Sequence, residues 1–178
     1  MKIIAVRHTS VHVPNGMCYG QSDVDTASTY TVEKDLVVQK LSSEKFTTVF
    51  SSPLTRCRQL ALAISRGVPV KFDARLMELN FGTWEGQNWN DIHRTYAANK
   101  WFRNWVQTPC PAGESYQQLL NRVEDFINHI QPVCNNHSVL LVTHAGVIRA
   151  LICLLNSYEP KRAFEINIDF GGLLTFEF

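Results

Sequence analysis

The sequence predicts an α/β fold with a largely parallel sheet. Short runs of aliphatic and β-branched residues alternate with longer segments whose apolar residues have helical spacing, an order typical of strand–helix–strand units. The two strongest runs, residues 3–6 and 138–143, are apolar almost throughout, as expected of buried parallel strands. With 178 residues, 45% hydrophobic and 19% charged, the chain is predicted to form one domain, residues 1–178, with a sizeable core.

Strands and helices alternate along the whole chain. A helical insert is expected at residues 88–106, between the third strand and the third long helix. The segments 9–30, 74–86 and 107–114 are expected to be loops. The predicted strands are residues 3–8, 47–51, 69–73, 138–143 and 173–178, and the predicted helices are residues 31–43, 53–66, 115–130 and 145–155.

Three of the helices have clear sequence signals. In residues 53–66 the apolar side chains share one face, Pro53 suits the first helical position, and Gly67 supplies a stop. In residues 115–130 apolar residues repeat at helical spacing, and Ser115 and Gln118 form a capping box at the start. Residues 145–155 are apolar almost all round, which predicts a well-buried helix.

Composition excludes several classes of partner. The net charge of +1 gives no general attraction to nucleic acid or to an anionic membrane, so any anion must be bound by a local cluster. No apolar stretch approaches the roughly 20 residues that span a bilayer, and no secretory signal precedes the first strand. The five cysteines lack metal-ligand spacing, and we expect reduced thiols in a cytoplasmic protein. Nothing in the pattern indicates an oligomeric state.

Two histidines follow the two strongest strands. His8 comes directly after the first strand and next to Arg7, and His144 comes directly after residues 138–143. Ligands of open α/β sheets bind beyond the carboxyl ends of the strands, so both side chains are candidates for chemistry on an anion. A neutral imidazole is a good nucleophile toward phosphorus, and the charge of Arg7 favours the neutral form of His8. The alternative for either residue is a structural histidine.

Further charged side chains are candidates for the same site. Arg56 lies in the first turn of the helix after residues 47–51, where an anion is attracted by unpaired N–H groups; the alternative is a solvated surface arginine. Glu78, between apolar residues in a glycine-containing loop, could donate a proton to a leaving oxygen. Glu85, in the same loop, is an equal candidate from the residues alone.

The segment from Trp84 to Trp105 is rich in aromatic rings. Such a stretch is more often the core of a helical excursion than a ligand site. The sharper hypothesis is a lid that stacks on a flat heteroaromatic group of the substrate. No spacing of histidine or cysteine indicates a metal site, and no glycine-rich nucleotide fingerprint is present.

Five motifs, in order along the chain, resemble the histidine phosphatase (phosphoglycerate mutase-like) superfamily. The resemblance implies a three-layer sandwich, in which helices flank a mostly parallel central sheet, with a helical lid insert at about residues 84–112. It implies no metal or other cofactor, and a small-molecule phosphomonoester as the partner. The motifs are Arg7-His8, residues 51–57 (Ser-Ser-Pro-Leu-Thr-Arg-Cys), residues 78–86 (Glu-Leu-Asn-Phe-Gly-Thr-Trp-Glu-Gly), residues 111–115 (Pro-Ala-Gly-Glu-Ser) and residues 142–146 (Val-Thr-His-Ala-Gly).

The resemblance also implies a role for each matching residue. His8 would be the nucleophile that becomes phosphohistidine, and Glu78, in preference to the other acid of its loop, would be the proton donor. Arg7, Arg56 and His144 would bind the phosphate.

The chain departs from the family pattern at two positions. Thr9 replaces the glycine that usually follows the nucleophile, so the turn there must accept a β-branched residue. Asn15 lies one position later than the family's asparagine. It is nevertheless a candidate substrate-binding residue, together with Tyr19 and Trp84.

Residues 16–24, with Arg7-His8-Thr9, resemble the α-ribazole phosphatases within this superfamily. That resemblance implies α-ribazole 5′-phosphate, or the phosphorylated cobamide that contains it, as the substrate. The alternatives are a broad-specificity sugar-phosphate or nucleotide phosphatase, a phosphoglycerate mutase, and a phospholigand-binding module without catalysis.

Overall fold

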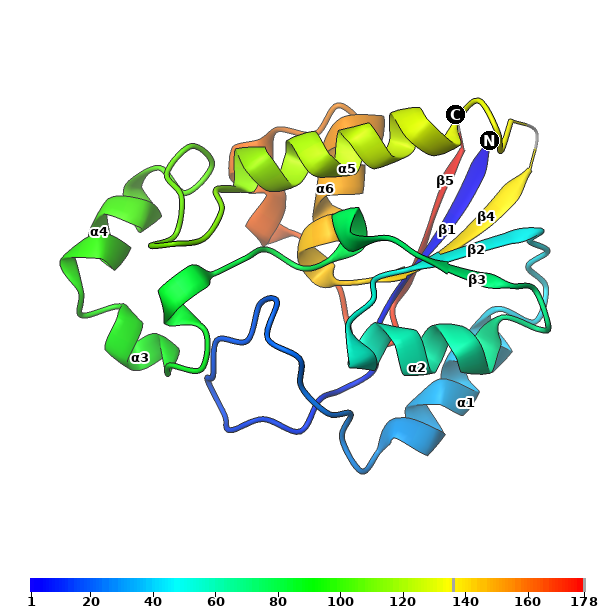
Figure 1. The fold of residues 1–178 in the computed structure, drawn as a ribbon, viewed down its shortest axis with the longest axis horizontal. Helices are drawn as coiled ribbons and strands as arrows, with labels where there is room; N and C mark the ends of the chain where they lie inside the picture. Colours follow the sequence, from blue (N-terminus) through cyan, green and yellow to red (C-terminus); the bar gives the residue numbers. More distant parts are fainter. Residues whose placement is uncertain (136, 178) are drawn as a thin grey trace.

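The computed structural model describes residues 1–135 and 137–177, which fold around one five-stranded sheet (Figure 1). The strand order is β3-β2-β4-β1-β5, and every neighbouring pair is parallel except β1 and β5. The mostly parallel sheet is therefore confirmed, and its edges are β3 and the antiparallel β5. Residue 178 of the last predicted strand lies outside the described residues. The strands are β1 (Lys2–Arg7), β2 (Thr48–Ser51), β3 (Val70–Phe72), β4 (Ser138–Thr143) and β5 (Leu173–Glu177).

Helices cover both faces of the sheet and give three layers (Figure 1). Helices α1 (Tyr30–Lys40) and α2 (Thr55–Ile64) lie on one face, and α5 (Tyr116–Ile130) and α6 (Ala145–Leu155) lie on the other. Side chains of a strand alternate between faces, so a strand buried on both sides must be apolar at every position.

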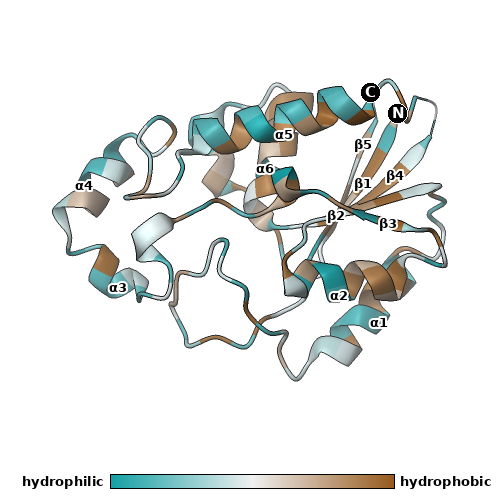
Figure 2. Ribbon diagram, in the orientation of Figure 1, coloured by the Kyte–Doolittle hydropathy of each residue, from teal (hydrophilic) through white to brown (hydrophobic). Residues whose placement is uncertain are grey.

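Strand β1 shows this two-sided burial directly. Ile3 and Ala5 belong to the cluster under α5 and α6, whereas Ile4 and Val6 pack with α1 and α2. All four are fully buried, and each large aliphatic side chain contributes about 1.5–3 kcal/mol by burial. Helix α6 is buried around most of its circumference, as predicted, whereas α5 has distinct hydrophilic and hydrophobic sides (Figure 2).

Of the two predicted helix starts with a local sequence signal, that of α5 is confirmed and that of α2 is wrong. The capping box of α5 is present, with Ser115 accepting from the backbone of Gln118 and the Gln118 side chain accepting from the backbone of Ser115. The prediction for Pro53 was wrong, because α2 begins at Thr55 with Leu54 as its N-cap. Pro53 precedes the cap, and the first turn of α2 still contains Arg56.

The aromatic insert is not one helix. It forms α3 (Trp89–Ile92) and α4 (Tyr96–Arg103), because the Thr95 side chain accepts from the backbone of Ala98 and starts a new helix. These helices lie beyond one end of the sheet, away from its two covered faces (Figure 1). The described residues also form three 3₁₀ helices, none of which was predicted: η1 (Ala74–Leu76) and η2 (Gly82–Trp84), both within the expected loop 74–86, and η3 (Pro160–Glu165). Among the described residues, no helix combines the length and hydrophobicity needed to cross a bilayer.

Candidate active site

Three parallel strands bring the candidate residues to one edge of the sheet. His8 follows β1, Ser52 follows β2 and His144 follows β4. The backbone N–H of His8 donates to Thr143 O at 3.0 Å, and that of Ser52 donates to Val142 O at 3.0 Å, so the three ends are in register. The rings of His8 and His144 are both buried, with centroids 5.2 Å apart in an edge-to-face arrangement.

The hydrogen bonding of His8 defines its tautomer. Nδ1 lies 2.7 Å from the carbonyl oxygen of Thr9, which only accepts, so Nδ1 carries the hydrogen. In a neutral ring Nε2 then keeps its lone pair. Burial holds the pKa of His8 well below its usual range, and the positive charges of Arg56 and Arg7 lower it further, against the opposing effect of the Thr9 hydrogen bond. The neutral, nucleophilic form is therefore favoured.

Thr9 occupies the turn without left-handed backbone. It is not among the non-glycine residues with positive φ, and it is fully buried. A β-branched residue is therefore accommodated directly after His8, where the family pattern has glycine. Its Oγ1 has no hydrogen-bond partner in the described part of the chain.

Two guanidinium groups lie beside these histidines. Arg56 is fully buried and donates to the carbonyl oxygens of Gly20 at 2.6 Å and Ser22 at 2.9 Å. Arg7 donates to Ile168 O at 2.5 Å and stacks over the ring of Phe170 at 3.8 Å.

The charges of these two guanidinium groups are not balanced by a carboxylate in the part of the chain that the structure describes. Within residues 1–135 and 137–177, neither Arg7 nor Arg56 forms an ion pair with a carboxylate, and the Nε of each is buried without a hydrogen-bond partner. A buried cation without a counter-charge is unfavourable, so Arg56, with the half-buried Arg7 beside it, is suited to binding an anion.

The carboxylate of Glu78 lines the same hollow as Arg7 and His8, a cavity of about 170 Å³. One oxygen accepts from the backbone of Leu79 at 2.9 Å and the other from the backbone of Gly146 at 3.1 Å. A Cβ at position 146 would lie 2.1 Å from Glu78 Oε1, so only glycine leaves room for this contact. The first turn of α6 thus holds the acid in place.

The two acids that the residues alone left open have different surroundings. Glu85 accepts from the backbone N–H groups of Gln21 at 2.8 Å and Ser22 at 2.6 Å, and from the Ser22 hydroxyl. Its carboxylate therefore fixes the loop whose carbonyl oxygens hold Arg56. Glu78, by contrast, lines the hollow with His8, and its role as the proton donor stays a prediction.

His144 contacts Ser52, which lies between β2 and α2, and Cys57 in α2. Its Nε2 lies 2.9 Å from Ser52 Oγ and 3.4 Å from Cys57 Sγ. Burial lowers the pKa of His144 well below its usual range, and the neighbouring His8 and Arg56 lower it further. The ring is therefore favoured in its neutral form when no anion is bound.

Of the three candidate substrate-binding residues, only Tyr19 lies at the hollow. Tyr19 lines the hollow, and its ring lies 5.2 Å from the Arg56 guanidinium carbon. Asn15 is exposed, its carbonyl accepts from Asn88 Nδ2, and it is not part of the lining. Trp84 is buried in the core against Trp101, and Trp89 lines the hollow instead. The hollow is also lined by residues of the segments 16–24, 78–86 and 84–105 that were not individual candidates: Met17, Cys18, Gly20, Phe81 and Trp89.

Arg122 is a positioning residue that the sequence did not reveal. It donates to the carbonyl oxygens of Arg75, Met77 and Glu78 at 2.6–2.8 Å and forms an ion pair with Glu114 at 2.6 Å. Glu114 in turn accepts from the backbone of Asn80 at 2.9 Å. This pair fixes the backbone on both sides of Glu78. The sequence signal that could have indicated Arg122 is Glu114, the acid of residues 111–115, because a largely buried carboxylate needs a cationic partner.

The fold and this edge of the sheet define a phosphatase of known type. The model of the histidine phosphatase superfamily (branch 1) matches residues 3–178. The chain belongs to the histidine phosphatase superfamily.

Proteins with different names are similar to this chain in sequence or in fold. Phosphoserine phosphatase 1 of Hydrogenobacter thermophilus is 30% identical over 176 residues, which cover 95% of this chain and 82% of the relative. The adenosylcobalamin/alpha-ribazole phosphatase of Escherichia coli (strain K12) is 29% identical over 135 residues, 74% of this chain and 66% of the relative. The crystal structure of the alpha-ribazole phosphatase from Shigella flexneri has the same fold, with a TM-score of 0.89 at 23% identity over 98% of this chain and 89% of that one.

Proposed function

We propose that this chain hydrolyses phosphomonoesters through a phosphohistidine formed on His8. The observation that carries the proposal is a buried Arg56 and a half-buried Arg7, neither paired with a carboxylate in the described residues, beside an imidazole whose Nε2 keeps its lone pair. A phosphate would supply the missing negative charge to Arg7 and Arg56 and place phosphorus next to the nucleophile.

The first step transfers the phosphoryl group to the enzyme. Nε2 of His8 attacks phosphorus while the bond to the alcohol oxygen breaks, and protonated Glu78 donates its proton to that oxygen. Arg7, Arg56 and His144 stabilise the charge on the other phosphate oxygens. The free alcohol leaves.

The second step releases phosphate. Water attacks phosphorus, Glu78 takes a proton from the water, and the N–P bond breaks to regenerate neutral His8 and inorganic phosphate. The cationic side chains supply the charge stabilisation that a metal ion supplies in other phosphatases. Activity is therefore expected to survive exhaustive treatment with a chelator.

The proposed substrate is α-ribazole 5′-phosphate or the phosphorylated cobamide that contains it, in the assembly of adenosylcobalamin. Residues 16–24 support this, since Tyr19 lines the hollow and the carbonyl oxygens of Gly20 and Ser22 hold Arg56. The names of relatives support both this substrate and phosphoserine. A broad-specificity sugar-phosphate or nucleotide phosphatase is the alternative.

The insert at about residues 84–112 is proposed to act as a lid over the substrate. The proposed setting is the cytoplasm, where the thiols stay reduced. All five cysteines are unpaired and buried, which supports this.

Rapid quenching with ³²P-labelled substrate tests the chemistry. Label is expected on a histidine in the wild-type enzyme, stable to base and labile to acid, and none is expected in His8→Ala with an unchanged circular dichroism spectrum. Label on another side chain, or turnover in His8→Ala, would refute the proposal. For the substrate, kcat/KM for α-ribazole 5′-phosphate is expected to exceed that for phosphoserine and for simple sugar phosphates.

A further inference from the structure

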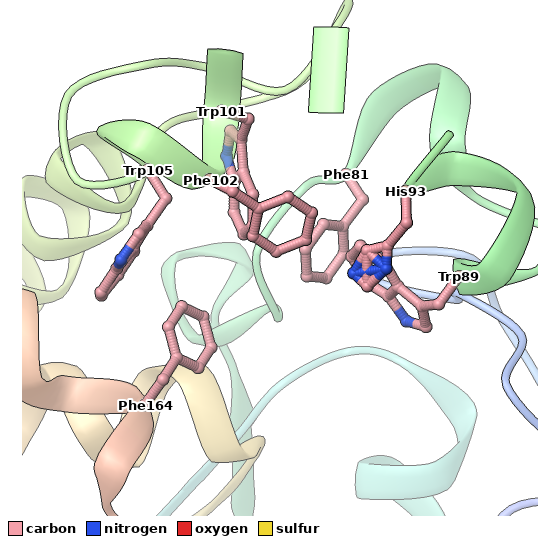
Figure 3. Close-up of a pocket in the computed structure, with 7 residues that line it drawn as sticks. All are labelled: Phe81, Trp89, His93, Trp101, Phe102, Trp105 and Phe164. Carbon is pink, nitrogen blue, oxygen red and sulfur yellow. The ribbon is translucent and has the colours of Figure 1, made fainter. Parts of the chain in front are cut away.

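A second hollow of about 430 Å³ adjoins the candidate active site. Phe81 and Trp89 line both hollows, so the two are neighbours at these rings. Every residue that lines the second hollow has a ring, and none bears a carboxylate, an ammonium or a guanidinium group. The lining residues are Phe81, Trp89, His93, Trp101, Phe102, Trp105 and Phe164 (Figure 3).

The rings come from separate parts of the chain and support one another. Trp89 lies in α3 and His93 directly follows it. Phe102 lies in α4, and Phe164 lies in η3, about sixty residues later in the sequence. His93 and Phe102 lie 4.5 Å apart, and Trp105 and Phe164 lie 4.4 Å apart. Figure 3 shows Trp105 and Phe164 on one side and Phe81, Trp89 and His93 on the other.

We propose that this hollow is a subsite for the alcohol half of the substrate and that it binds a flat, uncharged aromatic ring system. The inference rests on the proposed function, because it places the leaving group next to the phosphate of the same molecule. Aromatic walls favour stacked and edge-to-face contacts with another ring. The volume lies within the range of pockets that bind small organic ligands.

Two other classes of leaving group fit the hollow less well. An amino acid such as serine would place an ammonium and a carboxylate against walls that offer them few partners. A quaternary ammonium group is also bound by aromatic rings, but Arg149 lies 5.3 Å over the Phe164 ring, and Arg7 lines the neighbouring hollow. These positive charges disfavour a second cation.

Matched phosphate esters test the inference. 2-Naphthylmethyl phosphate and n-propyl phosphate both release a primary alcohol, so the ratio of their kcat/KM values reports on the ring. We expect the wild-type enzyme to favour the naphthyl ester by about a hundredfold. Phosphocholine is expected to react no faster than the propyl ester.

Two variants at the surface test whether the preference for the naphthyl ester comes from this hollow. Phe102 is 44% exposed and His93 is exposed, so Phe102→Ala and His93→Ala are expected to fold, which circular dichroism checks. Each is expected to lower the naphthyl-to-propyl ratio by about tenfold. Tyr96→Ala is the matched control, because Tyr96 lies on α4, is 84% exposed and does not line the hollow; its ratio should stay within about twofold of wild type.

Failure of the ring subsite can be distinguished from failure of the proposed phosphatase function. A wild-type ratio near one, a ratio unchanged in both variants, or a preference for phosphocholine would overturn the ring subsite while leaving the phosphatase intact. If p-nitrophenyl phosphate also fails to react and no phosphohistidine forms, the proposed function fails and the subsite fails with it.

Discussion

The proton on Nδ1 of His8 is held by the carbonyl oxygen of the adjacent residue, Thr9. A one-residue hydrogen bond of 2.7 Å needs no distant partner, so the tautomer is set as soon as the turn after β1 forms. Glu78 and Arg56 depend on distant contacts instead, with Gly146 and with Gly20 and Ser22. The proposed nucleophile is thus positioned locally, whereas the proposed acid and the proposed phosphate-binding arginine are positioned by the tertiary fold.

The role of Glu78 as proton donor predicts a dependence on the leaving group. In Glu78→Gln, alkyl phosphates are expected to lose about a thousandfold in kcat/KM, because their alkoxides cannot leave without a proton. p-Nitrophenyl phosphate should lose about tenfold or less. Steady-state kinetics on both esters measure the difference, and equal losses would show that Glu78 does not act as the acid.

Gly146 is predicted to matter through Glu78. The Gly146→Ala change adds a Cβ 2.1 Å from Glu78 Oε1, so the carboxylate must move and lose its backbone hydrogen bond. Alkyl phosphates are expected to lose about tenfold to a hundredfold in kcat/KM, and p-nitrophenyl phosphate less. In a Glu78→Asp background, whose carboxylate is one carbon shorter, the same change should have a smaller effect. An equal loss in both backgrounds would contradict the steric explanation.

At the scale of elements, the loop between β3 and η2 is held by α5. Arg122 donates to three carbonyl oxygens of this loop and pairs with Glu114, and both side chains are less than one-fifth exposed. The position of Glu78 therefore depends on one guanidinium group, which joins this loop to the segment that contains Glu114.

Arg122→Met is expected to lower the free energy of unfolding by about 3 kcal/mol, because it leaves the Glu114 carboxylate partly buried and unpaired. Urea unfolding measures this change. Arg122→Met with Glu114→Gln should regain part of the loss. The control is Arg94→Met, since the Arg94 pair with Asp91 is mostly exposed and contributes under about 1 kcal/mol. Similar losses in Arg94→Met and Arg122→Met would contradict the anchoring role.

At the scale of the whole molecule, two buried histidines couple stability to pH. Both have pKa values well below 6.5 in the folded state, mainly because of burial. Between those values and 6.5 the unfolded chain binds more protons than the folded one, so stability is highest above about pH 7 and falls as the pH decreases. Each histidine contributes a slope of up to about 1.4 kcal/mol per pH unit.

Urea unfolding at pH 7.5 and 5.5 in phosphate-free buffer measures this dependence. The double variant His8→Asn, His144→Gln is expected to flatten the change in unfolding free energy between the two pH values. His12→Asn, at an exposed position, should leave it unchanged. A double variant with the wild-type pH dependence would show that other groups are responsible.

The sequence predicts best those elements that are buried on all sides. The bounds of β4 and α6 agree with the predicted residues 138–143 and 145–155, because nearly every side chain there is apolar and the flanking residues are not. The insert is harder to predict. The sequence predicted a helical insert at residues 88–106 but not its division into two helices, because the break at Thr95 depends on a side-chain cap.

The site is predictable where a residue directly follows a strand. His8 and His144 were candidates from their positions alone, because parallel strands end at one edge. Glu78 and Glu85 could not be separated from the residues, since what distinguishes them is contact with Gly146 in one case and with Gln21 and Ser22 in the other. Such contacts join segments more than sixty residues apart, beyond the range of any local pattern.

The placement of the four tryptophans has a practical consequence. Trp84, Trp89, Trp101 and Trp105 all lie in the insert, and the sheet and its covering helices have none. Intrinsic emission excited at the red edge therefore reports on this one region, while far-ultraviolet dichroism reports mainly on the rest. Loosening of the insert before the sheet melts would appear as two non-coincident transitions, with no need for an added fluorophore.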